Sequence, residues 1–236
     1  AAHCESGAVT ALLRHAGADV GEPMIFGVSG TLFFGYFHSA MFPFPTFVLR
    51  HKPGKIRINA ARRLGAEFTV RRFRSPESAT AELDALLDKG IPVGVQADFF
   101  YMDYIPEYAR AHFNAHYIIV VGKEDNEYLV SDSYAPQLAR ISPKALQRGR
   151  FAKGAFAPRG LIFYPERVTQ DIDYERAITE GIREAARNML RLPIPFLGVR
   201  GIRRFAEKVR TWPRYMRDID HLSHEVMMIN VILEER

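Results

Sequence analysis

Hydrophobic residues near the start of the chain recur with the period of an amphipathic helix. Val9, Leu12 and Leu13 fall on one helical face, and Gly17 follows them as a C-terminal stop signal. The spacing therefore predicts a helix that begins near Cys4 and ends at Gly17.

Helical and strand patterns alternate through the next part of the chain. A short helix ending at Gly65 precedes alternating residues over 67–73, which predict a strand. Ser75, followed by a proline, opens another helix that keeps leucines on one face until Gly90. Residues 91–97 are expected to form a further strand.

Two later strands are predicted to form a hairpin. The apolar runs 116–121 and 128–132 are joined through Asp125-Asn126, a pair typical of tight turns. A last strand over 161–164 closes this region. Mixed helices and antiparallel strands of this kind indicate an α+β fold.

The pattern becomes helical after Pro165. Residues 172–192 have a helical period, prolines then break it, and a basic amphipathic helix begins near Val199. The stretch 221–236 predicts a helix that stops without a cap signal. We therefore expect a first domain over 1–165 and a helical domain over 166–236 that is incomplete at its C-terminus.

The stretch Met24 to Phe47 is dense in phenylalanine, glycine and proline. One interpretation is core packing combined with turns. The other is an aromatic wall that holds an acyl or amine group, because binding clefts are largely apolar.

Composition narrows the class of protein. The chain is 47% hydrophobic and 25% charged, which is typical of a soluble globular protein. It has neither an apolar run long enough to cross a membrane nor a recognisable export signal. Its single cysteine excludes an intramolecular disulfide and suits a reducing compartment. We therefore expect a cytoplasmic protein.

The net charge of +5 is unevenly distributed. Nine arginines and lysines but only one acid, Glu207, lie between Arg187 and Arg217, so this segment carries +8 and the rest of the chain about −3. A solvated helix face is one explanation, and a surface for an acidic partner is the other. Nucleic acid is not expected there, because base-reading and stacking groups do not alternate with the cations.

Cys4 is the candidate nucleophile. A cysteine is usually a small buried hydrophobic residue, but this one lies at a predicted helix start. Unpaired N–H groups and the helix dipole there favour the thiolate, which is the nucleophilic form. The residues that follow include Gly7 and Ala8, which are small enough to let a substrate approach the sulfur.

His116 and Asp132 are the candidate partners of Cys4. His116 begins one strand of the predicted hairpin and Asp132 ends the other. Because antiparallel pairing places these two ends side by side, the carboxylate can fix the imidazole that serves the cysteine. A structural role is the alternative for a histidine at a strand edge. His112 is the rival base, in the loop before the strand and without an obvious carboxylate.

The second donor of an oxyanion hole is less evident than the triad. The backbone N–H of Cys4 can supply one donor, and His3 and Gln96 are the candidates for another. No metal site is expected, because the histidines near Cys4 lack the spacing of metal ligands.

Five segments resemble, in order, a known family. They are HCESGAVTALLRHAG, GEPMIFGVSG, RINAARRLGAEF, GIPVGVQADFFYMDY and HYIIVVGKED with its following VSD, and they cover about residues 1–165. This part is similar to the N-terminal domain of the butirosin biosynthesis protein H acyltransferases. The segments ERAITEGIREAARNML and GVRGIRRFAEKVRTWPRYM resemble the helical domain that often follows.

The resemblance implies a papain-like fold, related to bacteriocin-processing peptidases, in which Cys4, His116 and Asp132 are catalytic. It also marks Asp98 and Tyr101 as cleft residues. Asp98 is then expected either to bind an amine or tune His116, or to have only a capping or hydrogen-bonding role.

The implied activity is transfer of an acyl or aminoacyl group from an acyl carrier protein thioester to a small-molecule amine, in secondary metabolism. No cofactor is expected apart from the phosphopantetheine of the carrier, and a homo-oligomer is compatible with the sequence. The alternatives are a papain-like peptidase, amidase or thioesterase that uses the same triad, and a non-catalytic binding module.

The basic segment then has an expected partner, because carrier proteins are acidic and would dock electrostatically. On a helix the cations gather on nearly one face, while Ile202, Phe205 and Val209 turn inward. The expected docking residues are Arg203, Arg204, Lys208 and Arg210.

Overall fold

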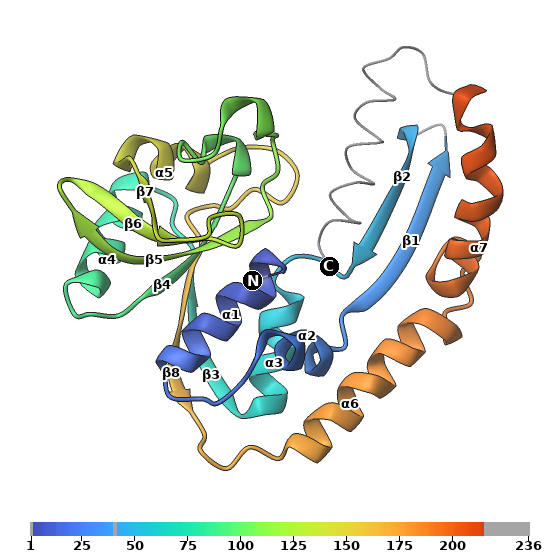
Figure 1. The fold of residues 1–236 in the computed structure, drawn as a ribbon, viewed down its shortest axis with the longest axis horizontal. Coiled ribbons are helices and arrows are strands. Elements are labelled where there is room, and N and C mark those ends of the chain that lie inside the picture. Colours follow the sequence, from blue (N-terminus) through green and yellow to red (C-terminus); the bar gives the residue numbers. More distant parts are fainter. Residues whose placement is uncertain (1, 40–41, 215–236) are drawn as a thin grey trace.

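The central element of the structure is a six-stranded antiparallel sheet with the order β3-β8-β4-β5-β6-β7. The computed structural model describes residues 2–39 and 42–214 (Figure 1). The strands are β3 (Ala66–Arg71), β4 (Val93–Ala97), β5 (His116–Glu124), β6 (Glu127–Ser131), β7 (Ala139–Ile141) and β8 (Ile162–Val168).

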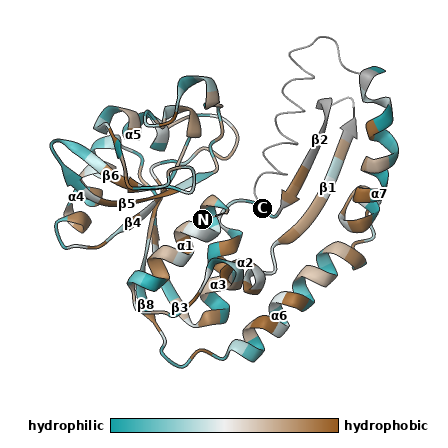
Figure 2. Ribbon diagram, viewed as in Figure 1, coloured by the Kyte–Doolittle hydropathy of each residue, from teal (hydrophilic) through white to brown (hydrophobic). Residues whose placement is uncertain are grey.

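Alternation along the strands gives the sheet two buried faces. In β5, Tyr117 and Ile119 belong to one hydrophobic cluster, whereas Ile118 and Val120 belong to another. The helices of the first face are α1 (Cys4–His15), α2 (Glu22–Ser29) and α3 (Lys55–Leu64). Those of the second are α4 (Pro76–Leu87) and α5 (Pro143–Arg150). The sheet is thus covered on both sides, and hydrophobic residues gather along its central strands (Figure 2).

The predicted hairpin is present and its turn explains its register. Asp125 and Asn126 have φ values of 49° and 65°, the left-handed conformation that a two-residue hairpin turn requires. The other helices and strands predicted within the described residues also form, with ends that differ by a few residues. Strand β7 and helix α5 were not predicted, because both are short and have no clear hydrophobic period.

The aromatic stretch after Met24 forms one helix and one hairpin. Its residues make α2, β1 (Leu32–Ser39) and β2 (Phe42–Arg50), and β1 and β2 pair as a separate two-stranded sheet. This hairpin was not predicted. Phe34 and Tyr36 pack in a cluster with Trp212, which supports the packing interpretation for this part of the stretch.

The later helices pack against the first part of the chain. They are α6 (Tyr174–Ala186), the π-helical turn η3 (Arg187–Arg191), α7 (Gly198–Lys208) and the 3-10 turn η4 (Val209–Arg214). Helix α6 approaches α2 closely at Gly181, where a Cβ atom would lie 2.6 Å from the Gly27 carbonyl oxygen. Buried Arg63 of α3 pairs with Glu180 and Glu184 of α6. Helix α6 therefore packs directly on helices that precede residue 165.

Helix α7 lies along the outer side of the β1–β2 hairpin (Figure 1). Phe205 and Val209 pack against the hairpin, as expected, but Ile202 is 40% exposed, contrary to its expected inward position. The predicted helix over 221–236 lies outside the described residues. Within the described ranges, no helix has the length and apolarity needed to span a bilayer.

Candidate active site

The start of α1 is held by hydrogen bonds around Cys4. His3 is the N-cap residue, and its Nδ1 accepts from the Ser6 backbone N–H at 3.3 Å. The Glu22 carboxylate accepts from the backbone N–H groups of Ala2 and His3, both at 2.9 Å. Because these contacts fix the first turn, Cys4 occupies the first helical position with its N–H outside the helix's own hydrogen-bond ladder.

Glu5 fixes α1 against α3. Its carboxylate is fully buried and accepts from the backbone N–H groups of Gly54 at 3.1 Å and Arg57 at 3.2 Å, at the start of α3. An acid in this position caps a helix N-terminus. Glu5 therefore positions the residue beside it, Cys4, although nothing in the sequence pattern indicates this role.

His116 and Asp132 lie together at the open end of the β5–β6 hairpin. Ile119 pairs with Ser131, so the start of β5 lies beside the residue that follows β6. The His116 Nε2 and Asp132 Oδ2 atoms are 2.8 Å apart, and both side chains are almost completely buried. The Cys4 Sγ donates to the carbonyl oxygen of Ala115, the residue before His116, at 3.9 Å. The structure therefore brings the three predicted residues together.

This arrangement favours the charged form of His116. Burial by itself lowers the pKa of His116, but hydrogen bonds with Asp132 and Cys4 outweigh it and raise the pKa to about 9. Burial raises the pKa of Asp132, but the His116 hydrogen bond and charge outweigh it, so the net pKa is lowered. The pair thus places an imidazolium and a carboxylate beside the sulfur at neutral pH.

Tyr104 is a further member of the cluster that the sequence did not reveal. Its hydroxyl donates to Asp132 Oδ2 at 2.5 Å, while the Tyr134 backbone N–H donates to Oδ1 at 3.1 Å. Burial and the neighbouring Asp132 carboxylate raise the pKa of Tyr104, so it remains a donor. Tyr104 lies in an irregular loop, where hydrophobic periodicity carries no signal.

Two aromatic rings pack on His116. Phe99, in the 3-10 turn η1 (Phe99–Tyr101), meets the imidazole edge to face with a centroid separation of 5.1 Å. Tyr134 does so at 5.7 Å. Their packing shields the imidazole from solvent, and His116 is only 1% exposed.

The two candidates for an oxyanion donor have other contacts. His3 caps α1, as described above. Gln96 Nε2 donates to the carbonyl oxygens of Asn114 and Phe156, both at 2.8 Å. Because an amide nitrogen has two hydrogens, this group is fully used in joining two loops. The geometry therefore assigns Gln96 a structural contact instead of a free donor.

Asp98 and Tyr101 border a surface hollow whose lining does not include Cys4. Asp98 Oδ2 pairs with His112 Nδ1 at 2.8 Å, so Asp98 does not contact His116 through this oxygen. The expectation that His112 lacks a carboxylate was wrong, because the loop before β5 folds back over the end of β4. Tyr101 lines a surface hollow together with this pair. No group of three potential metal ligands occurs in the described part of the chain.

Two family models match parts of the chain. Residues 3–133 match the family model of butirosin biosynthesis protein H, N-terminal, and residues 144–236 match a domain of unknown function (DUF4872). No curated protein gave a significant match.

Two solved structures are similar to the chain. The peptidase domain of Streptococcus ComA, a bifunctional ABC transporter involved in a quorum-sensing pathway, has 15% identity and a TM-score of 0.43, over 69% of this chain and 89% of that chain. A C39-like peptidase from Bacillus anthracis has 12% identity and a TM-score of 0.47, over 70% of this chain and 90% of that chain.

The predicted family is confirmed by the match over residues 3–133, and the helices and the antiparallel sheet confirm the predicted α+β class. Helix α1 carries the cysteine, and the antiparallel sheet carries the histidine, with Asp132 directly after β6. Since the family model covers more than half of the sequence, the chain belongs to the family of the butirosin biosynthesis protein H N-terminal domain.

Proposed function

We propose that the protein is an acyltransferase that uses Cys4 as nucleophile, His116 as acid and base, and Asp132 to orient the imidazole. The observation that carries the proposal is the buried His116–Asp132 pair at 2.8 Å, next to a cysteine at a helix start whose Sγ donates to the carbonyl oxygen of Ala115, the residue before His116. A nucleophile, a base and an orienting carboxylate in this order are the elements of covalent acyl transfer.

The reaction would proceed through an acyl-enzyme. The Cys4 thiolate attacks the carbonyl carbon of a carrier-protein thioester, and the carrier thiol leaves with a proton from the His116 imidazolium. An amine then attacks the Cys4 thioester, gives a proton to the neutral imidazole and leaves as the amide. The Cys4 thiolate and the His116 imidazolium are thereby restored.

Two observations favour transfer to an amine over hydrolysis: the name of the family model and the shielding of the His116 imidazole from water. The family model is named for a biosynthetic protein. The edges of Phe99 and Tyr134 cover the imidazole, so the acid–base group is poorly accessible to bulk water. Exclusion of water is one means by which an acyl-enzyme is kept for its intended acceptor.

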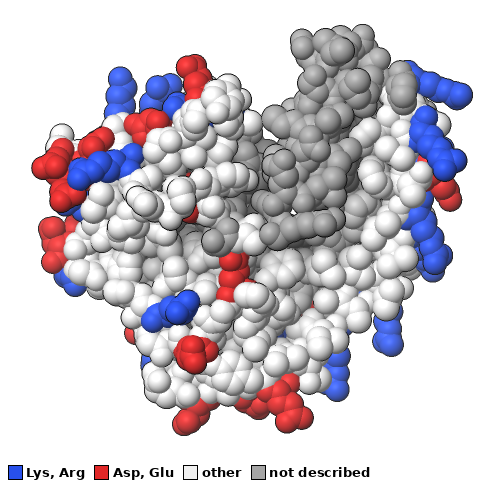
Figure 3. Space-filling model, viewed as in Figure 1, with Lys and Arg blue, Asp and Glu red and all other residues white. Residues whose placement is uncertain are grey.

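The proposal includes an electrostatic docking surface for the acidic carrier on α7 and η4. Arg203, Arg204, Lys208 and Arg210 are exposed, and none forms an ion pair with another residue in the described ranges. Figure 3 shows a row of cations along the outer edge of the molecule, where Figure 1 places α7. Because this edge is separated from Cys4 by the hairpin, the surface would act on encounter with the carrier instead of on the chemical step.

The central experiment follows the mass of the intact protein after mixing with an acyl-loaded carrier protein. The only cysteine in the sequence is Cys4, so a thioester adduct reports on that residue alone. We expect a mass increase that hydroxylamine removes and that Cys4→Ala abolishes. Full turnover by Cys4→Ala would refute the mechanism.

The acceptor is identified from the product formed when amines are added to the acyl-enzyme. Amide formation supports transfer. Release of the free acid alone, across a panel of primary amines, would assign the same residues to a hydrolase.

Docking is tested separately from chemistry. Arg203→Glu combined with Arg204→Glu should slow acylation by the carrier and flatten its salt dependence, because both effects depend on long-range charge. Acylation by a small thioester without the carrier should stay unchanged. Equal losses with both donors would contradict docking at α7.

A further inference from the structure

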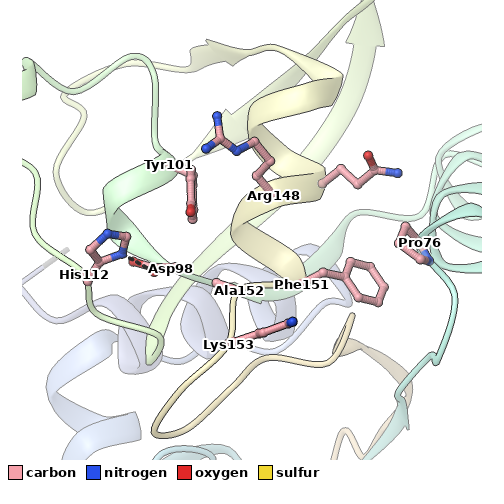
Figure 4. A pocket seen from close by; sticks show the side chains of 9 residues that line it. Pro76, Asp98, Tyr101, His112, Arg148, Phe151, Ala152 and Lys153 are labelled. Carbon is pink, nitrogen blue, oxygen red and sulfur yellow. Dashed lines mark hydrogen bonds and ion pairs between the residues drawn. The ribbon is translucent and has the colours of Figure 1, made fainter.

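A second polar site is bordered by η1 and does not include Cys4 in its lining. It is an open surface hollow of about 530 Å³, and its lining includes Asp98, Tyr101, His112, Arg148 and Lys153 (Figure 4). Asp98 and Tyr101 border this hollow, while the intervening Phe99 packs on His116. The short turn η1 therefore separates two sites with different chemistry.

The acid in the hollow is directed inward. Asp98 is 2% exposed, and its carboxylate accepts from His112 Nδ1 at 2.8 Å and from the backbone N–H groups of Phe100 at 3.0 Å and Phe113 at 2.9 Å. Three hydrogen-bond donors thus stabilise the buried negative charge of this carboxylate. What the pair presents to solvent is the histidine ring.

His112 is held rigidly by this contact. Its ring stacks on Phe100 with a centroid separation of 4.2 Å, and its side chain is 63% exposed. Because Asp98 occupies Nδ1, the ring nitrogen left for a ligand is Nε2. A carboxylate that fixes one nitrogen and directs the other outward is a common arrangement at binding sites.

Arg148 and Lys153 add two cations to the lining of the hollow. Neither forms an ion pair with any residue of the described ranges, and the Arg148 guanidinium lies 4.6 Å from the centre of the Tyr101 ring. In Figure 4 the Tyr101 hydroxyl points toward the middle of the hollow. A neighbouring hollow of about 290 Å³ shares Tyr101 and Arg148 and adds Lys144 to its lining, so positive charge extends along α5.

The helix dipole alone does not explain these cations. Basic residues are favourable near a helix C-terminus, and Arg148 lies in the last turn of α5. However, Lys153 lies beyond the helix and His112 comes from another loop. The carbonyl oxygens of Gly149 and Arg150 already accept from the backbone N–H groups of Asp98 and Gly160. The cations therefore surround an open space instead of capping the helix.

We propose that this hollow binds a phosphate ester. The planar guanidinium of Arg148 and the ammonium of Lys153 would bind the phosphate oxygens, and His112 Nε2 would donate to them when the ring is protonated. Phe151 and Tyr101 supply apolar surface for the attached group. The volume lies within the range of small-molecule pockets and exceeds the need of a phosphate ion alone.

The phosphate could belong to a free metabolite or to the pantetheine arm of a carrier protein, and both present the same chemistry. Binding does not depend on Cys4, so the hollow can be tested whether or not the acyl-transfer proposal holds.

The experiment measures binding calorimetrically with 4′-phosphopantetheine and with pantetheine, which lacks the phosphate. We expect the phosphorylated probe to bind and the unphosphorylated probe to bind at least about tenfold more weakly, because charge-assisted hydrogen bonds are lost. Lys153→Ala combined with Arg148→Ala should produce a loss of the same size. The matched control is Arg14→Ala combined with Lys89→Ala, which removes two exposed cations that line neither hollow.

The result that overturns the proposal is equal affinity for both probes, or an unchanged affinity in the Lys153 and Arg148 double variant. If that variant also weakens binding of the carrier with its arm attached, but not of the carrier without it, the arm is the ligand. If only the free ester is affected, the site serves a small phosphorylated molecule. Unfolding temperatures of both double variants confirm that they remain folded.

Discussion

Replacement of Asp132 by asparagine tests the electrostatic coupling at the candidate site. The His116 Nε2–Asp132 Oδ2 contact of 2.8 Å is a main reason that the pKa of His116 is raised to about 9 despite complete burial. Relative to an ordinary histidine near 6.5, this corresponds to about 3 kcal/mol in favour of the imidazolium. The Asp132→Asn substitution would keep the shape of the side chain but remove its charge.

Alkylation of Cys4 by iodoacetamide reports on the coupling without any knowledge of the substrate. A thiolate paired with an imidazolium reacts at neutral pH, whereas an ordinary thiol reacts only as the pH approaches about 8.5. We expect Asp132→Asn to react more slowly than the wild type at pH 7, by tenfold to roughly a hundredfold, the upper value being about 3 kcal/mol. The difference in alkylation rate between the wild type and Asp132→Asn should become smaller above pH 8.5.

The matched control is Asp98→Asn. Asp98 is also a buried carboxylate 2.8 Å from a histidine nitrogen, but its partner is His112. Its replacement should leave the alkylation profile of Cys4 unchanged. Superimposable profiles for the wild type and a folded Asp132→Asn protein would refute the coupling, since Asp132 would then have no influence on the sulfur.

Three further predictions concern the same fold. Tyr104→Phe removes a hydroxyl that donates to Asp132, so the free energy of unfolding, measured with urea, should fall by about 1–3 kcal/mol; no loss would mean that water replaces the hydroxyl. Gly181→Ala places a Cβ 2.6 Å from the Gly27 carbonyl oxygen, so the midpoint of thermal unfolding should fall by several degrees, which corresponds to a loss of about 1–3 kcal/mol in the free energy of unfolding. An unchanged midpoint would contradict close packing of α6 on α2. The pKa of His116 in the folded protein lies above its unfolded value of 6.5, so the contribution of His116 to the free energy of unfolding is complete below pH 6.5 and is lost as the pH rises through about 9. Urea titrations of the wild type should show this fall in the free energy of unfolding, and a similar fall in His116→Gln would assign it to another group.

Local patterns in the sequence determined much of the sheet and the position of the candidate triad. The Asp125-Asn126 turn has the left-handed conformation that sets a two-residue hairpin, and the hairpin register then fixes which ends of its strands meet. Because this information is local, the proximity of His116 and Asp132 could be predicted before any packing was known. The helix that begins at Cys4 was predictable for the same reason.

Other features were decided only by tertiary structure. In the β1–β2 hairpin, Phe34 and Tyr36 pack on the distant Trp212 and Phe205 of the helical part, a contact that no local pattern indicates. Tyr104 and the phosphate-ester site depend on loops whose residues meet only after α5 and the sheet have packed. Hydrophobic periodicity records which face of an element is buried, but it does not record which loop lies against which, because those contacts arise from the relative placement of elements far apart in the chain.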